Sequence, residues 1–171
     1  SLGQDSINSG SFAMMLGLIM ILIFMLLYYK GSGIIANTAL LINIIIIFAV
    51  LYTMNAVLTL PGIAGLLLTV GMSVDANVII FERIKEEIKL GNSIYISVKN
   101  GYNKAFTTIL DANITTLLTA FILSFIGSGP IKGFATTLSV GILCSMFTAI
   151  FLTRTIFLTL LSNKNFSKLS I

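Results

Sequence analysis

Long apolar stretches separated by short polar segments are the main pattern along this chain. Runs such as LIMILIFMLL contain no alternation of apolar and polar residues, which favours helices over the strands of a membrane β-barrel. Five stretches reach the roughly 20 residues that a helix needs to cross a hydrocarbon core about 30 Å thick. We therefore predict an all-α, polytopic membrane bundle of five transmembrane helices, forming one domain over residues 1–171. The expected spans are 12–29, 34–53, 58–81, 105–126 and 131–153.

The longest polar segment, 82–104, lies between the third and fourth spans. Its first part continues the preceding helix, with Ile84 and Ile88 on one face, and Gly91-Asn92 is typical of a helix stop. Ser93 is a suitable cap for a second short helix. We predict two short amphipathic helices on the cytoplasmic surface, with a solvated, weakly helical loop as the alternative. Residues 154–171 are expected to form a cytoplasmic tail.

Composition excludes an ordinary soluble domain. Hydrophobic residues make up 57% of the chain and charged residues 9%, against about 25% charged in typical soluble domains. The net charge of +4 follows the membrane pattern, because an N-out, C-in arrangement places all but one of the basic residues inside. We therefore expect contact with the lipid bilayer and no nucleic-acid partner. The inner residues are Lys30, Arg83, Lys85, Lys89, Lys99, Lys104, Arg154, Lys164 and Lys168; the outer one is Lys132.

The first ten residues, SLGQDSINSG, carry neither the basic start nor the apolar core of a signal peptide. An N-out chain of five spans needs a preceding segment to deliver its start across the membrane. We therefore expect this chain to be the C-terminal part of a longer protein, preceded by at least one further span.

Two aspartates lie inside hydrophobic spans, and each is followed by Ala-Asn. Asp75 precedes Glu82 by seven residues, and Asp111 follows Lys104 by seven, so both are about 10 Å inside the inner boundary. An intramembrane carboxylate costs roughly 2.5 to 3.5 kcal/mol to insert, and such residues usually face a bundle interior and mark proton or ion pathways. We predict a proton relay at Asp75 and Asp111. The alternative is a structural pair that only bonds neighbouring polar side chains.

Two further features of these spans concern partners. Asn77 and Asn113 each follow their aspartate by two residues, about 200° around the helix, so we expect them to bond neighbouring helices. No Lys, Arg or His lies at the depth of the aspartates. Any cationic partner of Asp75 is therefore expected to come from another chain.

Small residues at helical spacing mark two spans as helix-packing elements. Such stripes let membrane helices approach closely. They predict that the third and fifth spans lie within the bundle, whereas the first two, richer in large apolar residues, face lipid. The two stripes are Gly65, Thr69 and Ser73, and Gly133, Thr137, Gly141, Ser145 and Ala149.

Nothing in the sequence indicates catalysis. The chain has no histidine, and no nucleophile–base pair, phosphate-binding loop or metal cluster stands out. Its lone cysteine, Cys144, is interpreted as a packing residue. We expect no enzyme activity, no cofactor and no metal site.

Three motifs carry a resemblance to a known family. LPGIAGLLLTVGMSVDANVIIFERIKEE, GYNKAFTTILDANITTLLTAFIL and GSGPIKGFATTLSVGILCSMFTAIFLTR follow one another as in the SecD/SecF family of protein-export membrane proteins, which this chain closely resembles. The resemblance implies a resistance-nodulation-division (RND) type of bundle in the bacterial cytoplasmic (inner) membrane.

The resemblance also implies a function and partners. Members use the proton motive force to promote export after ATP-driven translocation, and the SecD subunit pairs with SecF and associates with the SecYEG channel and SecA. Secreted polypeptide is handled by a periplasmic domain that is missing from this chain. Asp75 matches the family aspartate implicated in proton transport together with an arginine from SecF, and Asp111 also matches the family pattern.

Two other functions stay open on the sequence alone. One is a proton-coupled exporter of lipids or small molecules from the same superfamily, which uses the same kind of buried acid. The other is a passive scaffold for the translocase, in which the aspartates have no part in proton movement.

Overall fold

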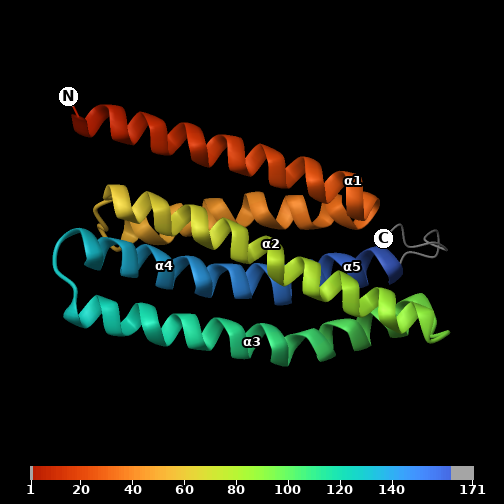
Figure 1. The fold of residues 1–171 in the computed structure, drawn as a ribbon. Coiled ribbons are helices and arrows are strands. Elements are labelled where there is room, and N and C mark those ends of the chain that lie inside the picture. The colour runs from red at the N-terminus through yellow and green to blue at the C-terminus, as the bar shows by residue number, and fades with distance from the viewer. Residues whose placement is uncertain (1, 163–171) are drawn as a thin grey trace.

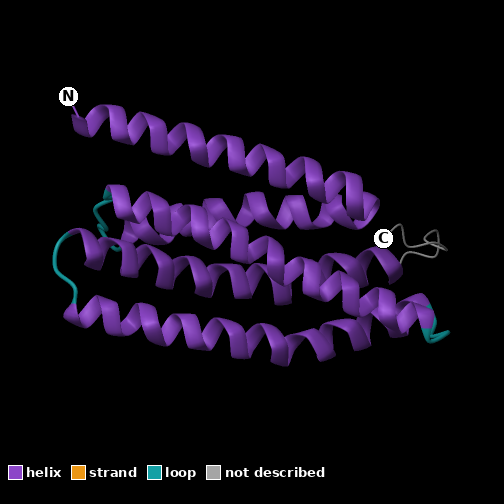
Figure 2. Ribbon diagram, in the orientation of Figure 1, coloured by secondary structure: helices purple, strands orange, loops and turns teal. Residues whose placement is uncertain are grey.

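The computed structural model describes residues 2–162, and this part of the chain is helical, with no strand (Figures 1 and 2). Four runs are long and apolar enough to cross a membrane: Ile7–Thr53, Leu60–Lys89, Ile94–Ile126 and Pro130–Ser162. The elements are α1 (Leu2–Thr53), α2 (Leu60–Lys89), α3 (Ile94–Ile126), α4 (Pro130–Phe147), the π-helical turn η1 (Thr148–Leu152) and α5 (Thr153–Ser162).

Helix α1 folds back on itself at Lys30, whose backbone is non-helical at φ 46° and ψ −115°. A straight helix of its 52 residues would be about 78 Å long. Instead, Figure 1 shows two antiparallel arms. Gly33 packs so tightly on the first arm that an added Cβ would lie 2.1 Å from the Met25 carbonyl oxygen. Asn37 Nδ2 also donates to the Leu22 carbonyl at 3.0 Å. The reversal lies between the first two expected spans.

The segment 82–104 does not form two separate short helices. Helix α2 continues to Lys89 and stops before Gly91, which has φ +85°, as the sequence predicts. However, α3 runs without a break from Ile94 to Ile126, so the second helix of this segment continues directly into the next apolar run. The reason is packing: Val98, Tyr102 and Ala105 are buried on one continuous face of the helix.

The first part of the expected C-terminal tail is helical. The run that begins at Pro130 passes through η1 and ends at Ser162, so it includes residues 154–162. Thr153 is fully buried and Phe157 nearly so, which explains why the helix continues here. The rest of the predicted tail, 163–171, lies outside the described residues.

Helices α2 and α4 form the centre of the bundle. The most apolar window is 56% buried in α2 and 61% buried in the run from α4 to α5, against 33% in α1 and 17% in α3. The third and fifth expected spans therefore lie inside, as their small residues indicate. The high exposure of α3 was not apparent from its sequence.

One end of the bundle is joined by an aromatic core. Phe81 of α2 packs on Tyr29 of α1 and Phe157 of α5, with ring centroids 5.1 Å and 5.7 Å apart. Tyr102 of α3 packs on the same Phe157 at 6.2 Å, and its hydroxyl donates to Thr153 Oγ1 at 2.7 Å. This end, on the right in Figure 1, also holds the turns at Lys30 and at 90–93.

Candidate functional site

The two small-residue stripes lie against each other and fix how α2 meets α4. A Cβ added to Gly141 would lie 2.4 Å from Thr69 Cγ2, and one added to Gly65 would lie 3.2 Å from the Phe134 carbonyl oxygen. Helices α2 and α4 can thus pack closely, because Gly65 and Gly141 have no side chains to separate them. The other members lie along the same seam: Gly133 against Thr59, Thr137 beside Gly62, and Ser73 and Ser145 buried.

Asp75 lies on the face of α2 that points away from this seam. Ser73 and Asn77 flank it two residues to each side and are buried, whereas Asp75 is exposed. Its carboxylate stands at one end of an open groove of about 520 Å³, otherwise lined by apolar residues and glycine: Ala64, Leu67, Leu68, Gly71 and Met72. Within residues 2–162 it forms no hydrogen bond or ion pair. Gly71, one turn away, has nothing within 4 Å of an added Cβ.

Asp111 lies at nearly the same level on α3. An added Cβ on Gly101 would lie 2.5 Å from Ile84 Cγ1, so these two residues mark where antiparallel α2 and α3 meet. Asp75 is nine residues from Ile84 and Asp111 is ten from Gly101, about 14 and 15 Å along their helices. The expected matching depth is therefore present. Both carboxylates are exposed, however, so they do not face a shared interior built by this chain alone.

Asn77 and Asn113 are buried. The prediction that they bond neighbouring helices is wrong, because each bonds to its own helix. Asn77 Nδ2 donates to the Ser73 carbonyl at 3.1 Å and Asn113 Nδ2 to the Ile109 carbonyl at 2.7 Å, one turn back in each case. A short amide side chain reaches its own i−4 carbonyl easily, and this contact competes with one across the bundle.

A buried polar contact between α1 and α2 is made by Asn43, which was not predicted from the sequence. Its Nδ2 donates to Ser73 Oγ at 3.3 Å, and the residue is fully buried. The signal is an asparagine inside the apolar run LLINIIII. In a membrane bundle such a residue is expected to face inward because lipid cannot satisfy its amide.

A second polar cluster ties α2 to α3 at the end that holds the aromatic core. Glu87 is nearly covered, and its carboxylate accepts from Lys104 Nζ at 2.5 Å, Asn92 Nδ2 at 2.9 Å and Asn100 Nδ2 at 3.0 Å. The hydrogen bond from Lys104, followed by that from Asn100, holds the pKa of Glu87 below its ordinary value. Glu87 lies outside the expected membrane spans, and its role here is to join two helices.

The site chemistry therefore reduces to Asp75. Among residues 2–162, no three His, Cys, Asp or Glu side chains gather as a metal would require. Cys144 is buried and unpaired. A carboxylate on an outward apolar groove can exchange a proton or pair with a cation, but both need something outside this chain to complete the surroundings.

Sequence relatives agree on one family. The family described as "Protein export membrane protein SecD/SecF, C-terminal" matches residues 1–163. The chain is 57% identical to the protein translocase subunit SecD of Desulfurispirillum indicum and 54% identical to that of Magnetococcus marinus. Each match covers 100% of this chain and 33% of the relative. For the SecD of Haemophilus influenzae the identity is 53%, over 100% of the chain and 28% of the relative.

A solved structure agrees as well. The crystal structure of SecDF from Thermus thermophilus, described as a translocon-associated membrane protein, superposes with a TM-score of 0.91 at 38% identity, covering 96% of this chain and 23% of that one. The chain thus spans about a third or less of the length of these relatives, whose names describe translocase subunits and not catalysts. It is a multi-pass membrane protein, and it belongs to the SecD/SecF family of protein export membrane proteins, matching the C-terminal part.

Proposed function

We propose that this chain is the membrane part of a Sec translocase accessory subunit that uses the proton motive force to promote protein export across the bacterial cytoplasmic membrane. The family supports the role in export. The observation that carries the coupling is the position of Asp75, a carboxylate at mid-helix on the outward, apolar face of α2. Asp111, level with it on α3, is proposed as a second member of the relay.

We propose five membrane crossings, with the two arms of α1 each crossing once. Each arm has more than the roughly 20 residues that a crossing needs. The charges support an N-out, C-in orientation, because most of the described basic residues belong to the end with the Lys30 turn, and Lys132 to the other. In this arrangement the ends of α2 and α3 that carry Glu87 and Lys104 extend into the cytoplasm.

The partner implied by the groove is a second membrane protein that supplies a cation. Leaving a carboxylate unpaired in hydrocarbon costs roughly 2.5 to 3.5 kcal/mol, and Lys or Arg from a helix seated on α2 would offset this cost. Ala64 and Gly71 leave room on this face for close helix contact. We propose SecF as this partner and the SecYEG channel, with SecA, as the assembly. The secreted polypeptide would be held by parts of the longer protein outside this chain.

The proposed mechanism is a switch at one ion pair. Protonation of Asp75 neutralises it and releases the partner cation, which favours a different seating of the two helices. A potential of 100 mV supplies about 2.3 kcal/mol for each charge that crosses, so a few protons bias such a switch strongly.

The test compares Asp75→Asn with wild type in the full-length protein, assembled with its partner subunit in vesicles. We expect export to lose most of its dependence on the proton gradient, because the amide fills the same space but cannot take up a proton. Asp75→Glu should retain part of the coupling. Asp5→Asn, an exposed acid outside the expected spans, is the matched control and should have no effect.

Other outcomes favour the other functions. If Asp75→Asn leaves gradient-dependent export unchanged, the coupling proposal fails and a passive scaffold remains. If the wild-type complex moves a lipid or small molecule against its gradient, and this movement stops in Asp75→Asn while export continues, the exporter function is favoured.

A further inference from the structure

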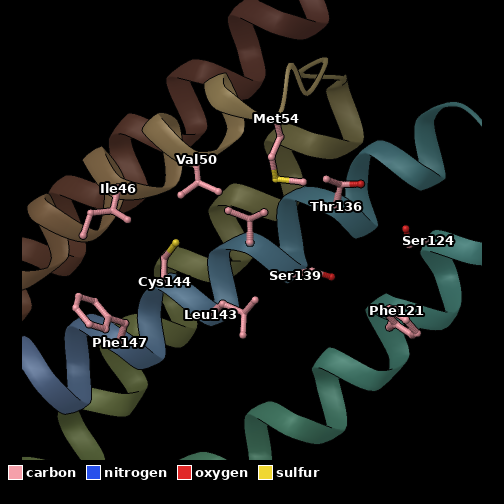
Figure 3. Close-up of a pocket in the computed structure, with 11 residues that line it drawn as sticks. Ile46, Val50, Met54, Phe121, Ser124, Thr136, Ser139, Leu143, Cys144 and Phe147 are labelled. Carbon is pink, nitrogen blue, oxygen red and sulfur yellow. The ribbon is translucent and has the colours of Figure 1, made fainter.

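A second groove lies on the other side of the bundle, among α1, α3 and α4, with a volume of about 570 Å³ (Figure 3). This size is within the 300 to 1,000 Å³ typical of sites for small ligands. Its wall is mainly apolar, with Val50 of α1, Phe121 of α3 and Leu143 and Phe147 of α4 (Figure 3). The Asp75 groove shares none of its lining residues.

The groove has a polar end. Three hydroxyl residues, Ser124, Thr136 and Ser139, line it toward the start of α4. Lys132 precedes Thr136 by one turn, on the same helix face, and Thr136 Oγ1 donates to the Lys132 carbonyl at 2.9 Å. Lys132 is exposed, and it is the one basic side chain that the proposed topology places at this end. Lys132 therefore places a cation one helical turn beyond the polar end of the apolar groove.

The dimensions match one acyl chain. Along α4 the lining runs from Thr136 to Phe147, eleven residues or about 17 Å. One leaflet of a bilayer is about 15 Å deep in hydrocarbon. The groove is therefore long enough for the acyl chain of a lipid from one leaflet.

We propose that this groove binds a phospholipid, with one acyl chain along the apolar wall and the phosphate at Lys132. The ammonium of Lys132 and the nearby start of α4, where the helix dipole is positive, both favour an anionic headgroup. The apolar wall keeps the chain in place by contact area, which a bulk-lipid position on a convex helix does not offer. Which leaflet supplies the lipid follows from the topology proposed above; the outer leaflet is expected.

The test uses the full-length protein in phosphatidylethanolamine vesicles doped with phosphatidylglycerol that carries a photoreactive diazirine on its acyl chain. After irradiation, we expect adducts on Leu143 and Phe147 to exceed those on Ile45 several-fold. Ile45 is the matched control, since it neighbours the groove residue Ile46 at similar depth but is exposed on a different face of α1. Lys132→Gln should reduce the groove adducts several-fold and leave Ile45 unchanged, whereas Lys132→Arg should retain them.

Three results would overturn the proposal. Equal labelling of Leu143 and Ile45 would mean that the groove holds only bulk lipid. Unchanged labelling in Lys132→Gln would remove the headgroup contact. A photoreactive amino acid placed at Phe147 that forms adducts with protein and not with lipid would show that another helix fills the groove. All three readouts are independent of export, so they do not depend on Asp75.

Discussion

At the scale of single residues, Lys30 has a strained backbone. Its φ of 46° and ψ of −115° lie in a region that side chains disfavour, because Cβ approaches the neighbouring carbonyl. The chain adopts almost the same conformation at Gly129, with φ 51° and ψ −116°, and there it uses glycine. Comparing Lys30 with Gly129 therefore shows that a side chain adds free energy to this backbone conformation.

We therefore expect Lys30→Gly to raise the free energy of unfolding by about 1 kcal/mol. Backbone strain of this kind costs roughly 1 to 3 kcal/mol, and part of this gain is lost because glycine increases the conformational entropy of the unfolded chain. Unfolding of the purified full-length protein in mixed micelles measures it. Lys30→Ala is the control, as it removes the charge but keeps Cβ. An equal gain in both variants would mean that the charge, and not the backbone, destabilises the turn.

At the scale of elements, the sequence predicts the helices well and their mutual arrangement only in part. The apolar runs and the stripe spacing of Gly133, Thr137 and Gly141 are local signals, so the apolar helices and the central position of α2 and α4 follow from them. That the two stripes pack on each other was not predicted. The continuity of α3 through residue 104 was not predicted, because Val98 and Tyr102 are held by tertiary packing, which no local pattern reports. The outward direction of Asp75 was missed for a related reason: periodicity shows that it lies opposite Asn77, but not which of the two faces meets α4.

Glu87 supplies the element-scale prediction, because it holds α2 and α3 together. Its pKa in the folded protein lies below the ordinary 4.5, chiefly through the hydrogen bond from Lys104. A lowered folded-state pKa adds stability above the ordinary value, and that stability is lost as the pH falls through the folded-state value. Stability of the wild type should thus fall as the pH drops from about 4.5, and Glu87→Gln should lack this part of the decline.

Acid unfolding in mixed micelles, followed by circular dichroism, measures the difference. Glu86→Gln is the matched control, since Glu86 is exposed and pairs only with Arg83, one turn away on the same helix. It should keep the wild-type pH profile. If Glu87→Gln also keeps that profile, the cluster does not contribute to stability in this pH range.

At the scale of the whole molecule, α2 serves two surfaces at once. Its inner face, with Gly65, Thr69 and Ser73, is covered by α4, whereas its outer face carries Asp75 and Gly71 and is covered by nothing within residues 2–162. A central helix that leaves a carboxylate and a glycine bare is expected to meet another membrane protein there. Stability of this bundle and assembly with a partner should therefore separate cleanly by mutation.

Gly71→Leu tests that separation. An added Cβ at Gly71 meets nothing within 4 Å, and leucine favours a helix over glycine by up to about 1 kcal/mol, so the bundle should be as stable as wild type or slightly more so. The leucine would nevertheless fill the groove beside Asp75 and hold a partner helix away, so co-purification with the partner subunit and gradient-dependent export should both fall.

Ala49→Leu, which adds similar bulk on an exposed face of α1, should leave both unchanged. Gly141→Leu should instead destabilise the bundle itself, because its Cβ would lie 2.4 Å from Thr69 Cγ2. Normal partner binding by Gly71→Leu would mean that the outer face of α2 meets lipid, and the cation would then have to reach Asp75 by another route.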